Sequence, residues 1–312
     1  MSFYSTYIRR NESASAYMKA ASLPEGRWID VGGVHTRYYE AGRGDPVVFV
    51  YGGNFGTSDS ASSAYTFSLN WKPLSGTHRV LMPDKLGQGE TGNPKTDADY
   101  TMHAVVQHLA GFIRALKLPP VHIVGHSRGG YAAVRLTLEH HDLVRSVSLV
   151  NSGTLSPGVG TNEVVLSRPP HPRYTAECVR WVYQNYSFNP GVVTDEWVSA
   201  VLETLALPKY RESVRKIEEE KLGMTLFLPE LAKEKRETLQ WLDEGRLQRP
   251  VQVFWGFDDR TATIDRGVEL FRTLAKHERR AQFHVINQSG HFPFREHSAR
   301  FNALLSRWVT SC

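Results

Sequence analysis

The fold is decided by the stretch V-H-I-V-G-H-S-R-G-G-Y-A-A-V-R-L-T-L-E, residues 121–139. Its apolar start, 121–124, predicts a buried strand, and the run 131–139, rich in Ala, Val and Leu, predicts a helix. Between them stands G-H-S-R-G-G, 125–130. Glycines around a serine at such a turn let the backbone pass closely while the serine is held out in a strained conformation. We therefore expect Ser127 to be presented at a helix N-terminus, with backbone N–H donors behind it.

Strand and helix patterns alternate on both sides of this stretch. A Gly32-Gly33 pair between two β-rich runs predicts a hairpin. Helical spacing of apolar residues predicts helices over 102–118, with Thr101 as N-cap, and over 299–308. The predicted strands are 28–31, 34–39, 47–50, 80–82, 121–124, 147–150, 251–255 and 283–286. Alternation at this spacing is typical of an α/β fold with a mostly parallel central sheet flanked by helices.

The interval 153–249 differs from the rest of the chain in composition and in hydrophobic pattern. Its start is rich in Pro and Gly, and its later part, 209–249, has dense mixed charge and helical patterning. We interpret 153–249 as a helical cap over a core formed by 25–152 and 250–312; a separate helical domain is the alternative. Apolar residues of the cap, such as Phe227 and Trp241, are expected to face the cleft or the core. Residues 1–24 carry no apolar segment and are predicted to form a loosely docked N-terminal arm.

Composition excludes several classes of function. The net charge of +5 is mild, and no block of Lys and Arg stands out, so nucleic acid is not an expected partner. No stretch approaches 18 apolar residues, so a membrane is not expected either. The two cysteines, Cys178 and Cys312, can build neither a disulfide framework nor a zinc ribbon, which favours a reducing, cytoplasmic setting. The expected partner is a small-molecule substrate, and the oligomeric state stays open, with a homodimer as the alternative to a monomer.

A serine nucleophile needs a base, and the base needs a carboxylate to orient it. The base candidate is His291, which follows Gly290 just after a predicted strand. The carboxylate candidates are Asp258 and Asp259, which follow the strand 251–255. The order serine, acid, histidine along the chain is the one this topology requires. The competing histidines are expected in other roles: His284 inside a strand, His297 on the last helix, and His126 pointing elsewhere on the serine turn.

The developing negative charge on a carbonyl oxygen needs preorganised donors. One should be the backbone N–H of Arg128, which follows the nucleophile. The other should come from the small-residue loop 51–56, with Gly53 as the expected donor. Three aromatic residues, Phe55, Phe292 and Trp241, are predicted to contact the substrate. Neither a Cys/His cluster nor a G-x-x-x-x-G-K-[ST] phosphate loop is found, so we expect no metal and no cofactor.

From about 28 to 309, the chain resembles the α/β-hydrolases that carry a cap. Within that superfamily it is most similar to the meta-cleavage product hydrolases, which break a carbon–carbon bond in vinylogous 1,5-diketones from aromatic-ring degradation. The resemblance rests on W-G-x-D-D-R at 255–260, G-H at 290–291, L-V-N-S-G at 149–153, V-T-D-E at 193–196 and the turn P-D-K-L-G-Q-G at 83–89. Position in the W-G-x-x-D pattern implies that Asp259 is the triad acid.

The chain departs from that group at residues that bind its substrate. His126 replaces Asn before the nucleophile, Phe292 replaces Trp after the catalytic histidine, and Tyr51 replaces the His of the oxyanion loop; in an ungapped comparison, Val201 falls at a cap arginine. The resemblance implies a serine-dependent hydrolase acting at a carbonyl, with a ring-fission dienoate as the first substrate and an ester or lactone as the alternative. Ser127 argues against dehalogenases and epoxide hydrolases of this fold, which need Asp there. A non-catalytic binding protein would not need the triad, although a cofactor-free haloperoxidase would share it.

Overall fold

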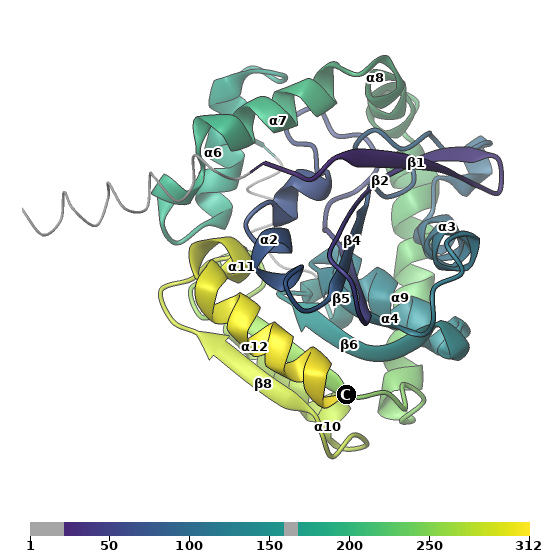
Figure 1. The fold of residues 1–312 in the computed structure, drawn as a ribbon. Helices are drawn as coiled ribbons and strands as arrows, with labels where there is room; N and C mark the ends of the chain where they lie inside the picture. The colour runs from purple at the N-terminus through teal and green to yellow at the C-terminus, as the bar shows by residue number, and fades with distance from the viewer. Residues whose placement is uncertain (1–21, 159–167) are drawn as a thin grey trace, which may run out of the picture.

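The computed structural model describes residues 22–158 and 168–312, so the predicted N-terminal arm lies outside it except for 22–24. The described residues form an eight-stranded sheet in the order β1-β2-β4-β3-β5-β6-β7-β8 (Figure 1). Pairs β1–β2 and β2–β4 are antiparallel, and the other neighbours are parallel. The strands are β1 (Gly26–Val31), β2 (Val34–Ala41), β3 (Pro46–Val50), β4 (Arg79–Pro83), β5 (Val121–His126), β6 (Val144–Val150), β7 (Val251–Gly256) and β8 (Gln282–Ile286). The predicted mostly parallel sheet is confirmed.

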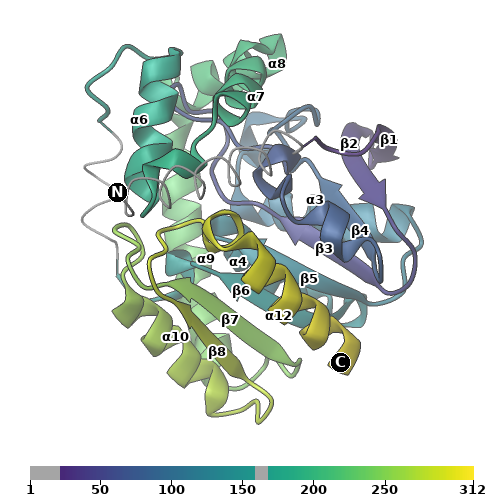
Figure 2. The same cartoon turned by 60° about the vertical axis from the view of Figure 1, so that its left-hand side comes forward.

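Helices cover both faces of this sheet (Figure 2). On one face lie α3 (Met102–Ala115), α4 (Arg128–Glu139), α9 (Leu228–Asp243) and α10 (Ile264–Ala275). On the other lie α2 (Trp71–Leu74), α11 (Pro293–Glu296) and α12 (Ser298–Ser311). Alternate residues of β3 enter the two apolar cores, Val48 and Val50 on one side and Val47 and Phe49 on the other. This double burial explains the continuous apolar runs of the sequence.

Two local predictions are confirmed by backbone geometry. Gly32 and Gly33 both have positive φ, +59° and +81°, as a two-residue hairpin turn with the right twist requires. Thr101 caps α3 by accepting a hydrogen bond from the Ala104 N–H at 3.2 Å. The helix is shorter than predicted, because the chain turns left-handed at Lys117, with φ at +50°.

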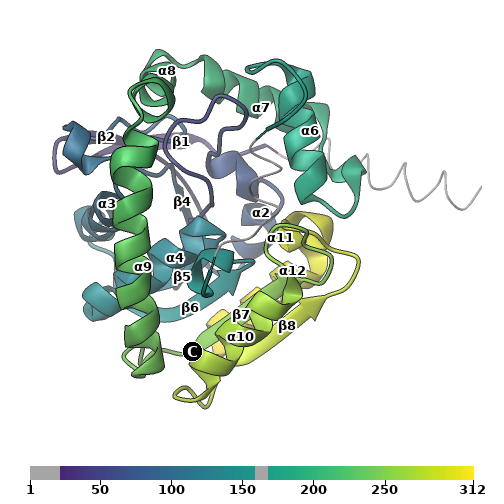
Figure 3. The same cartoon turned by 180° about the vertical axis from the view of Figure 1, so that it is seen from behind.

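The segment between β6 and β7 is helical, but its parts lie in different places (Figure 3). Its helices before α9 are α6 (Ala176–Tyr186), α7 (Asp195–Ala206) and α8 (Pro208–Val214), followed by π-helical turns η6 (Arg215–Glu219) and η7 (Gly223–Phe227). Tyr183 and Tyr210 donate hydrogen bonds to the carbonyls of Ala61 and Ser60, which lie in the loop after β3. Helix α9 instead contacts α4, where Arg135 donates hydrogen bonds to Thr238 and Glu237, and its Leu231 and Leu242 belong to the core on that face of the sheet. The cap boundary of 153–249 stays a prediction, and 159–167 lie outside the described residues.

Short 3-10 turns join these elements: η1 (Ala64–Phe67), η2 (Asp97–Asp99), η3 (His141–Leu143), η4 (Gly153–Leu155) and η5 (Pro190–Val192). In the ranges that the structure describes, no helix is both long and apolar enough to cross a bilayer.

Candidate active site

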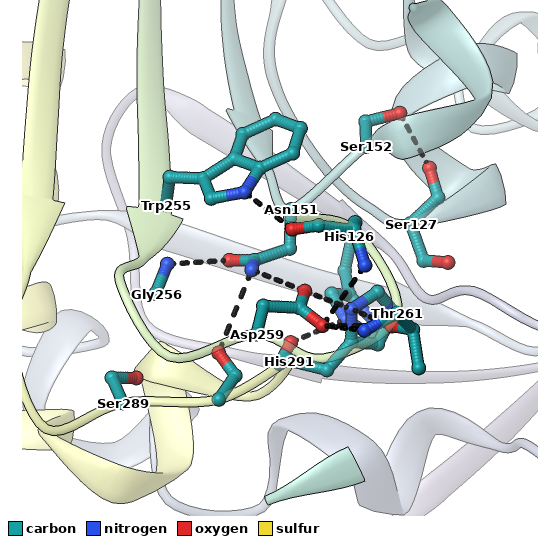
Figure 4. Close-up of polar contacts among 12 residues, drawn as sticks. His126, Ser127, Asn151, Ser152, Trp255, Gly256, Asp259, Thr261, Ser289 and His291 are labelled. Atoms are coloured by element: carbon teal, nitrogen blue, oxygen red, sulfur yellow. Dashed lines mark hydrogen bonds and ion pairs between the residues drawn. The ribbon is translucent and has the colours of Figure 1, made fainter. Parts of the chain in front are cut away.

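Ser127 stands at the sharp turn between β5 and α4. Its backbone has φ +53° and ψ −125°, a conformation that residues other than glycine rarely adopt. The turn closes because its glycines leave no room for a side chain: a Cβ on Gly125 would lie 2.5 Å from the Gly129 carbonyl oxygen, and one on Gly129 would lie 2.1 Å from that of Val50. The Ser127 N–H donates a hydrogen bond of 2.8 Å to the Val150 carbonyl. Ser152 Oγ donates one of 2.7 Å to the Ser127 carbonyl (Figure 4), and the two bonds fix the turn.

His291 and Asp259 lie in hydrogen-bond contact, each on the loop after its strand. His291 Nδ1 is 2.6 Å from Asp259 Oδ2, and both residues are buried. A proton on Nδ1 leaves Nε2 with a lone pair, the tautomer that a general base needs. Asp258 faces elsewhere: its N–H donates to the Ser289 carbonyl at 2.9 Å, and its Oδ2 has no partner among the described residues.

The Asp259 carboxylate is held by donors from two neighbouring loops. Asn151 Nδ2 donates to Oδ2 at 2.6 Å, while the N–H and Oγ1 of Thr261 donate to Oδ1 at 2.8 and 2.7 Å. Burial alone would raise the pKa of Asp259. The charge of His291, together with hydrogen bonds from His291, Ala262 and Thr261, outweighs burial, so the pKa of Asp259 is lowered. The carboxylate therefore stays ionised opposite the imidazole.

The backbone of the His291 loop is pinned by Glu296. Glu296 Oε2 accepts hydrogen bonds from the Gly290 N–H at 2.6 Å and from Ser289 Oγ at 3.1 Å. Its Oε1 accepts from the N–H groups of Phe188 and Asn189, the residues that follow α6 by two and three positions. The His291 N–H itself donates to the Tyr186 carbonyl at 2.7 Å. The end of α6 and the histidine loop are thus one hydrogen-bonded unit.

His126 differs from its prediction. Its ring does not point away from the site: Nε2 donates to the His291 carbonyl at 2.9 Å, and the two rings lie 4.7 Å apart. Burial, followed by the charges of His291 and Lys85, holds the pKa of His126 well below its usual range. His126 is therefore neutral. Because it precedes Ser127 in the chain, its hydrogen bond connects the serine turn directly to the His291 backbone.

The loop after β3 passes close to the serine. A Cβ on Gly52 would lie 2.7 Å from Ser127 Cβ and 3.2 Å from Ser127 Oγ, so only glycine allows this approach. Gly53 has a left-handed φ of +79°. Arg128 begins α4, and its guanidinium hydrogen-bonds to Asn54 Oδ1 of the same loop. The two residues expected to donate backbone N–H groups, Gly53 and Arg128, thus lie on the two segments that meet at Ser127.

The three predicted substrate-contacting aromatic residues have different positions. Phe292 is buried against His126 and His291, at ring distances of 5.3 and 5.6 Å. Phe55 packs on Tyr100 and Phe227, at 5.0 and 5.8 Å.

Trp241 requires a correction. Its ring lies under the guanidinium groups of Arg135 and Arg246, at 4.3 and 5.3 Å, on the far part of α9. Arg135 is eight residues along from Ser127, about 12 Å of helix. The expectation failed because the side of α9 that carries Trp241 contacts α4 and not the cleft. Trp241 therefore belongs to the contact between α4 and α9.

Sequence reasoning missed the residues that orient the acid and the histidine loop. Asn151 enters only through the resemblance in L-V-N-S-G, and neither Thr261 nor Glu296 belongs to a motif that the sequence shows. A signal was available for Asn151, because it follows β6, the strand between β5 and β7, and parallel neighbours end at the same edge. Thr261 stands two residues after Asp259, the spacing at which an Asp side chain accepts a hydrogen bond from the backbone.

Comparison with known proteins gives a consistent result. A family model described as alpha/beta hydrolase fold matches residues 45–298. The chain is 28% identical over 294 residues to a 2-hydroxymuconate semialdehyde hydrolase of Pseudomonas sp. (strain CF600), covering 91% of this chain and 93% of that protein. It is 36% identical, over 46% of each chain, to a 2-hydroxy-6-oxo-6-(2'-aminophenyl)hexa-2,4-dienoic acid hydrolase of Metapseudomonas resinovorans. A mutant of the meta-cleavage product hydrolase CumD from Pseudomonas fluorescens IP01, complexed with acetates, superposes with a TM-score of 0.74 at 26% identity, covering 92% of this chain and 98% of that one.

Proposed function

Because the chain belongs to the alpha/beta hydrolase fold family, we propose that it is a serine-dependent hydrolase that acts at a carbonyl, with Ser127, His291 and Asp259 as its triad. Two observations carry the proposal: the Asp259–His291 hydrogen bond of 2.6 Å, and the strained strand–helix turn of Ser127, whose neighbour His126 donates a hydrogen bond to the His291 carbonyl. Strain at a buried turn is retained where the surrounding structure enforces it, and such turns concentrate at active sites.

In this mechanism Ser127 Oγ attacks the carbonyl carbon while His291 Nε2 takes the hydroxyl proton. Asp259 holds Nδ1–H and stabilises the imidazolium that forms. The tetrahedral oxyanion accepts hydrogen bonds from the N–H groups of Gly53 and Arg128. As the intermediate collapses, the bond to the leaving group breaks, and that group takes the proton from His291. Water then repeats the sequence on the acyl-enzyme.

The first proposed substrate is a ring-fission dienoate of aromatic degradation, whose carbon–carbon bond next to the carbonyl is cleaved. The support is that relatives named for such dienoates and semialdehydes match over most of the chain, at modest identity. The leaving group would be an enolate carbon, which His291 protonates. We propose that the helices α6, α7 and α8 act as the cap that excludes water from this site.

A small apolar ester or lactone is the second candidate. Val201, at the position where an ungapped comparison puts a cap arginine of the meta-cleavage group, is buried within an apolar cluster that also contains Phe292 and Trp197. An apolar wall there favours a substrate without a carboxylate on that side. The leaving group would then be an alkoxide.

The test is a turnover screen with three substrate classes: a ring-fission dienoate, an aryl ester and a lactone. The parent should turn over at least one class, and Ser127→Ala should lose about 10⁴-fold or more in kcat on it. Circular dichroism should confirm that Ser127→Ala stays folded. Full activity of Ser127→Ala would refute the serine mechanism.

Both cysteines, Cys178 and Cys312, are free thiols in the structure. We propose the cytoplasm as the compartment, since thiols stay reduced there.

A further inference from the structure

A buried lysine holds the loop that faces the nucleophile. Lys85 follows β4, and its Nζ donates hydrogen bonds to the Gly52 carbonyl at 2.9 Å and to the Gly53 carbonyl at 3.3 Å. The side chain is only 4% exposed, and its Nζ lies 5.1 Å from the centre of the Tyr51 ring. We infer that Lys85 is a positioning residue that orients the Gly52–Gly53 peptide for oxyanion binding, an inference that rests on the proposed function.

Peptide geometry connects this contact to the reacting atoms. The described chain has no cis peptide bonds, so the Gly52 carbonyl and the Gly53 N–H belong to one trans peptide and point in opposite directions. Lys85 lies on the carbonyl side of that peptide. Gly52 is at the same time packed against Ser127. Lys85 therefore fixes the rotation of the peptide whose N–H is the proposed oxyanion donor.

A charged donor on the carbonyl also strengthens the N–H. A hydrogen bond to a peptide oxygen polarises the peptide, and bonds from ionised donors are about twice as strong as neutral ones. The ammonium of Lys85 thus makes the Gly53 N–H a better donor. Its positive charge stabilises the developing oxyanion as well, because buried sites screen charge weakly.

The charges around Lys85 come from several elements. The Arg128 guanidinium belongs to α4, the His126 imidazole to β5, and the Tyr51 phenol follows β3. The adjacent Asp84 carboxylate accepts hydrogen bonds from the N–H groups of Ala64 and Glu90 and from the Tyr51 hydroxyl. Burial, followed by the charge of Arg128, lowers the pKa of Lys85 to about 7.

Stability and catalysis should respond to Lys85 in opposite directions. A lysine whose pKa is lowered by folding binds its proton less well in the folded state, so below that pKa the protonated side chain weakens the fold. Replacing a buried charge by an apolar residue of similar volume is often neutral or stabilising. Lys85→Met should therefore keep or increase stability in urea. A residue needed only for the fold would show the reverse.

The test measures the labelling of Ser127 by an alkyl fluorophosphonate, followed by mass spectrometry. In this reaction the Ser127 Oγ–P bond forms, the P–F bond breaks, fluoride leaves, and His291 takes the serine proton; the phosphoryl oxygen occupies the oxyanion site. Lys85→Met should be labelled about 10- to 100-fold more slowly than the parent, less than the loss for a deleted donor itself. Lys85→Gln, which can still donate to the Gly52 carbonyl, should recover part of the rate.

The pH profile gives the second readout. In the parent, deprotonation of Lys85 should lower the labelling rate as pH rises through about 7, and this decline should be absent in Lys85→Met. The matched control is Lys235→Met, which removes a lysine of α9 whose Nζ also donates to a glycine carbonyl, that of Gly158. It should keep the parent rate and profile.

One result would overturn both the proposed function and the role of Lys85, and another would overturn the role of Lys85 alone. Absence of labelling at Ser127 in the parent would overturn the proposed function and, with it, the role of Lys85. Normal labelling of the parent, with the same rate and pH profile in Lys85→Met, would leave the function standing and overturn the role of Lys85 alone.

Discussion

Helix α4 has an arginine stacked on an aromatic ring near each of its two ends, and only the first of these contacts borders the candidate active site. At the first turn the Arg128 guanidinium lies 5.8 Å from the Phe227 ring; two turns on, the Arg135 guanidinium lies 4.3 Å from the Trp241 ring. Both aromatic residues come from the segment that ends in α9. An arginine over an aromatic face is therefore not by itself a sign of function.

The surroundings of the two pairs differ. Arg135 is buried and forms ion pairs with Glu139 and Glu237, and it also donates to Thr238 Oγ1 at 3.1 Å. Arg128 hydrogen-bonds to Asn54, a residue of the loop that passes Ser127. The far pair thus joins two helices to each other, while the near pair joins a helix to the loop beside the nucleophile.

Similar contacts can thus serve a helix–helix interface in one place and border the candidate active site in another. At the far end, charges and hydrogen bonds are matched between two rigid helices, which stabilises their packing. At the near end, the groups converge on backbone segments around Ser127. Substitutions near Ser127 should therefore change rates, and substitutions near Arg135 should change stability.

The largest effect is expected from Asp259→Asn. Asn keeps the shape of the side chain but favours the wrong imidazole tautomer, so the labelling or turnover rate should fall about 10³- to 10⁴-fold. Circular dichroism should show that the variant stays folded, although the midpoint of urea unfolding should fall, because the groups that donate to the carboxylate lose an ionised acceptor.

Asp258→Asn is the matched control for this prediction. Its carboxylate makes no hydrogen bond to His291, so the rate should stay close to that of the parent. Equal losses of rate in the two variants would mean that the hydrogen bond between Asp259 and His291 does not set the rate.

Phe227→Leu should have an intermediate effect. Phe227 packs edge-on against Phe55, a predicted substrate contact, and lies under Arg128, so the change to Leu should shift both neighbours while keeping most of the apolar volume. We expect the ratio of kcat/KM between a large and a small acyl ester to shift by about 10-fold, the range for one or two methylenes in an apolar pocket. An unchanged ratio would remove Phe227 from the pocket.

The parts of the site that sequence predicts are those encoded locally. The turn around Ser127 follows from glycines one or two residues away. The end of the strand 251–255 indicates Asp258 and Asp259 as acid candidates, the resemblance in the W-G-x-x-D pattern implies Asp259, and Gly290 precedes His291. Each signal lies within a few residues of the side chain that it concerns, so no knowledge of distant contacts is needed.

The parts that sequence misses depend on distant contacts. A lysine in a turn, such as Lys85, is usually solvated, and only the packing of β3 and α4 around it makes it buried. Helical periodicity shows that Trp241 is on an apolar side of its helix, but it does not show which neighbour that side meets. The contact of His126 is hidden for the same reason, since its partner His291 is 165 residues away.

Trp241→Leu should have the smallest effect, and it tests the far end of α4. The change removes two arginine contacts and part of the aromatic surface, while Arg135 keeps its bonds to Glu139 and Glu237. A partly exposed cation–π contact contributes about 0.5–1 kcal/mol, so the free energy of urea unfolding should fall by about 1 kcal/mol. The substrate ranking that Phe227→Leu shifts should stay that of the parent, because Trp241 packs on Arg135, which lies about 12 Å along α4 from Ser127. A changed substrate ranking with an unchanged free energy of unfolding would mean that the contact of Arg135 and Trp241, and not only that of Arg128 and Phe227, belongs to the substrate site. Helix α9 would then act as part of the cap.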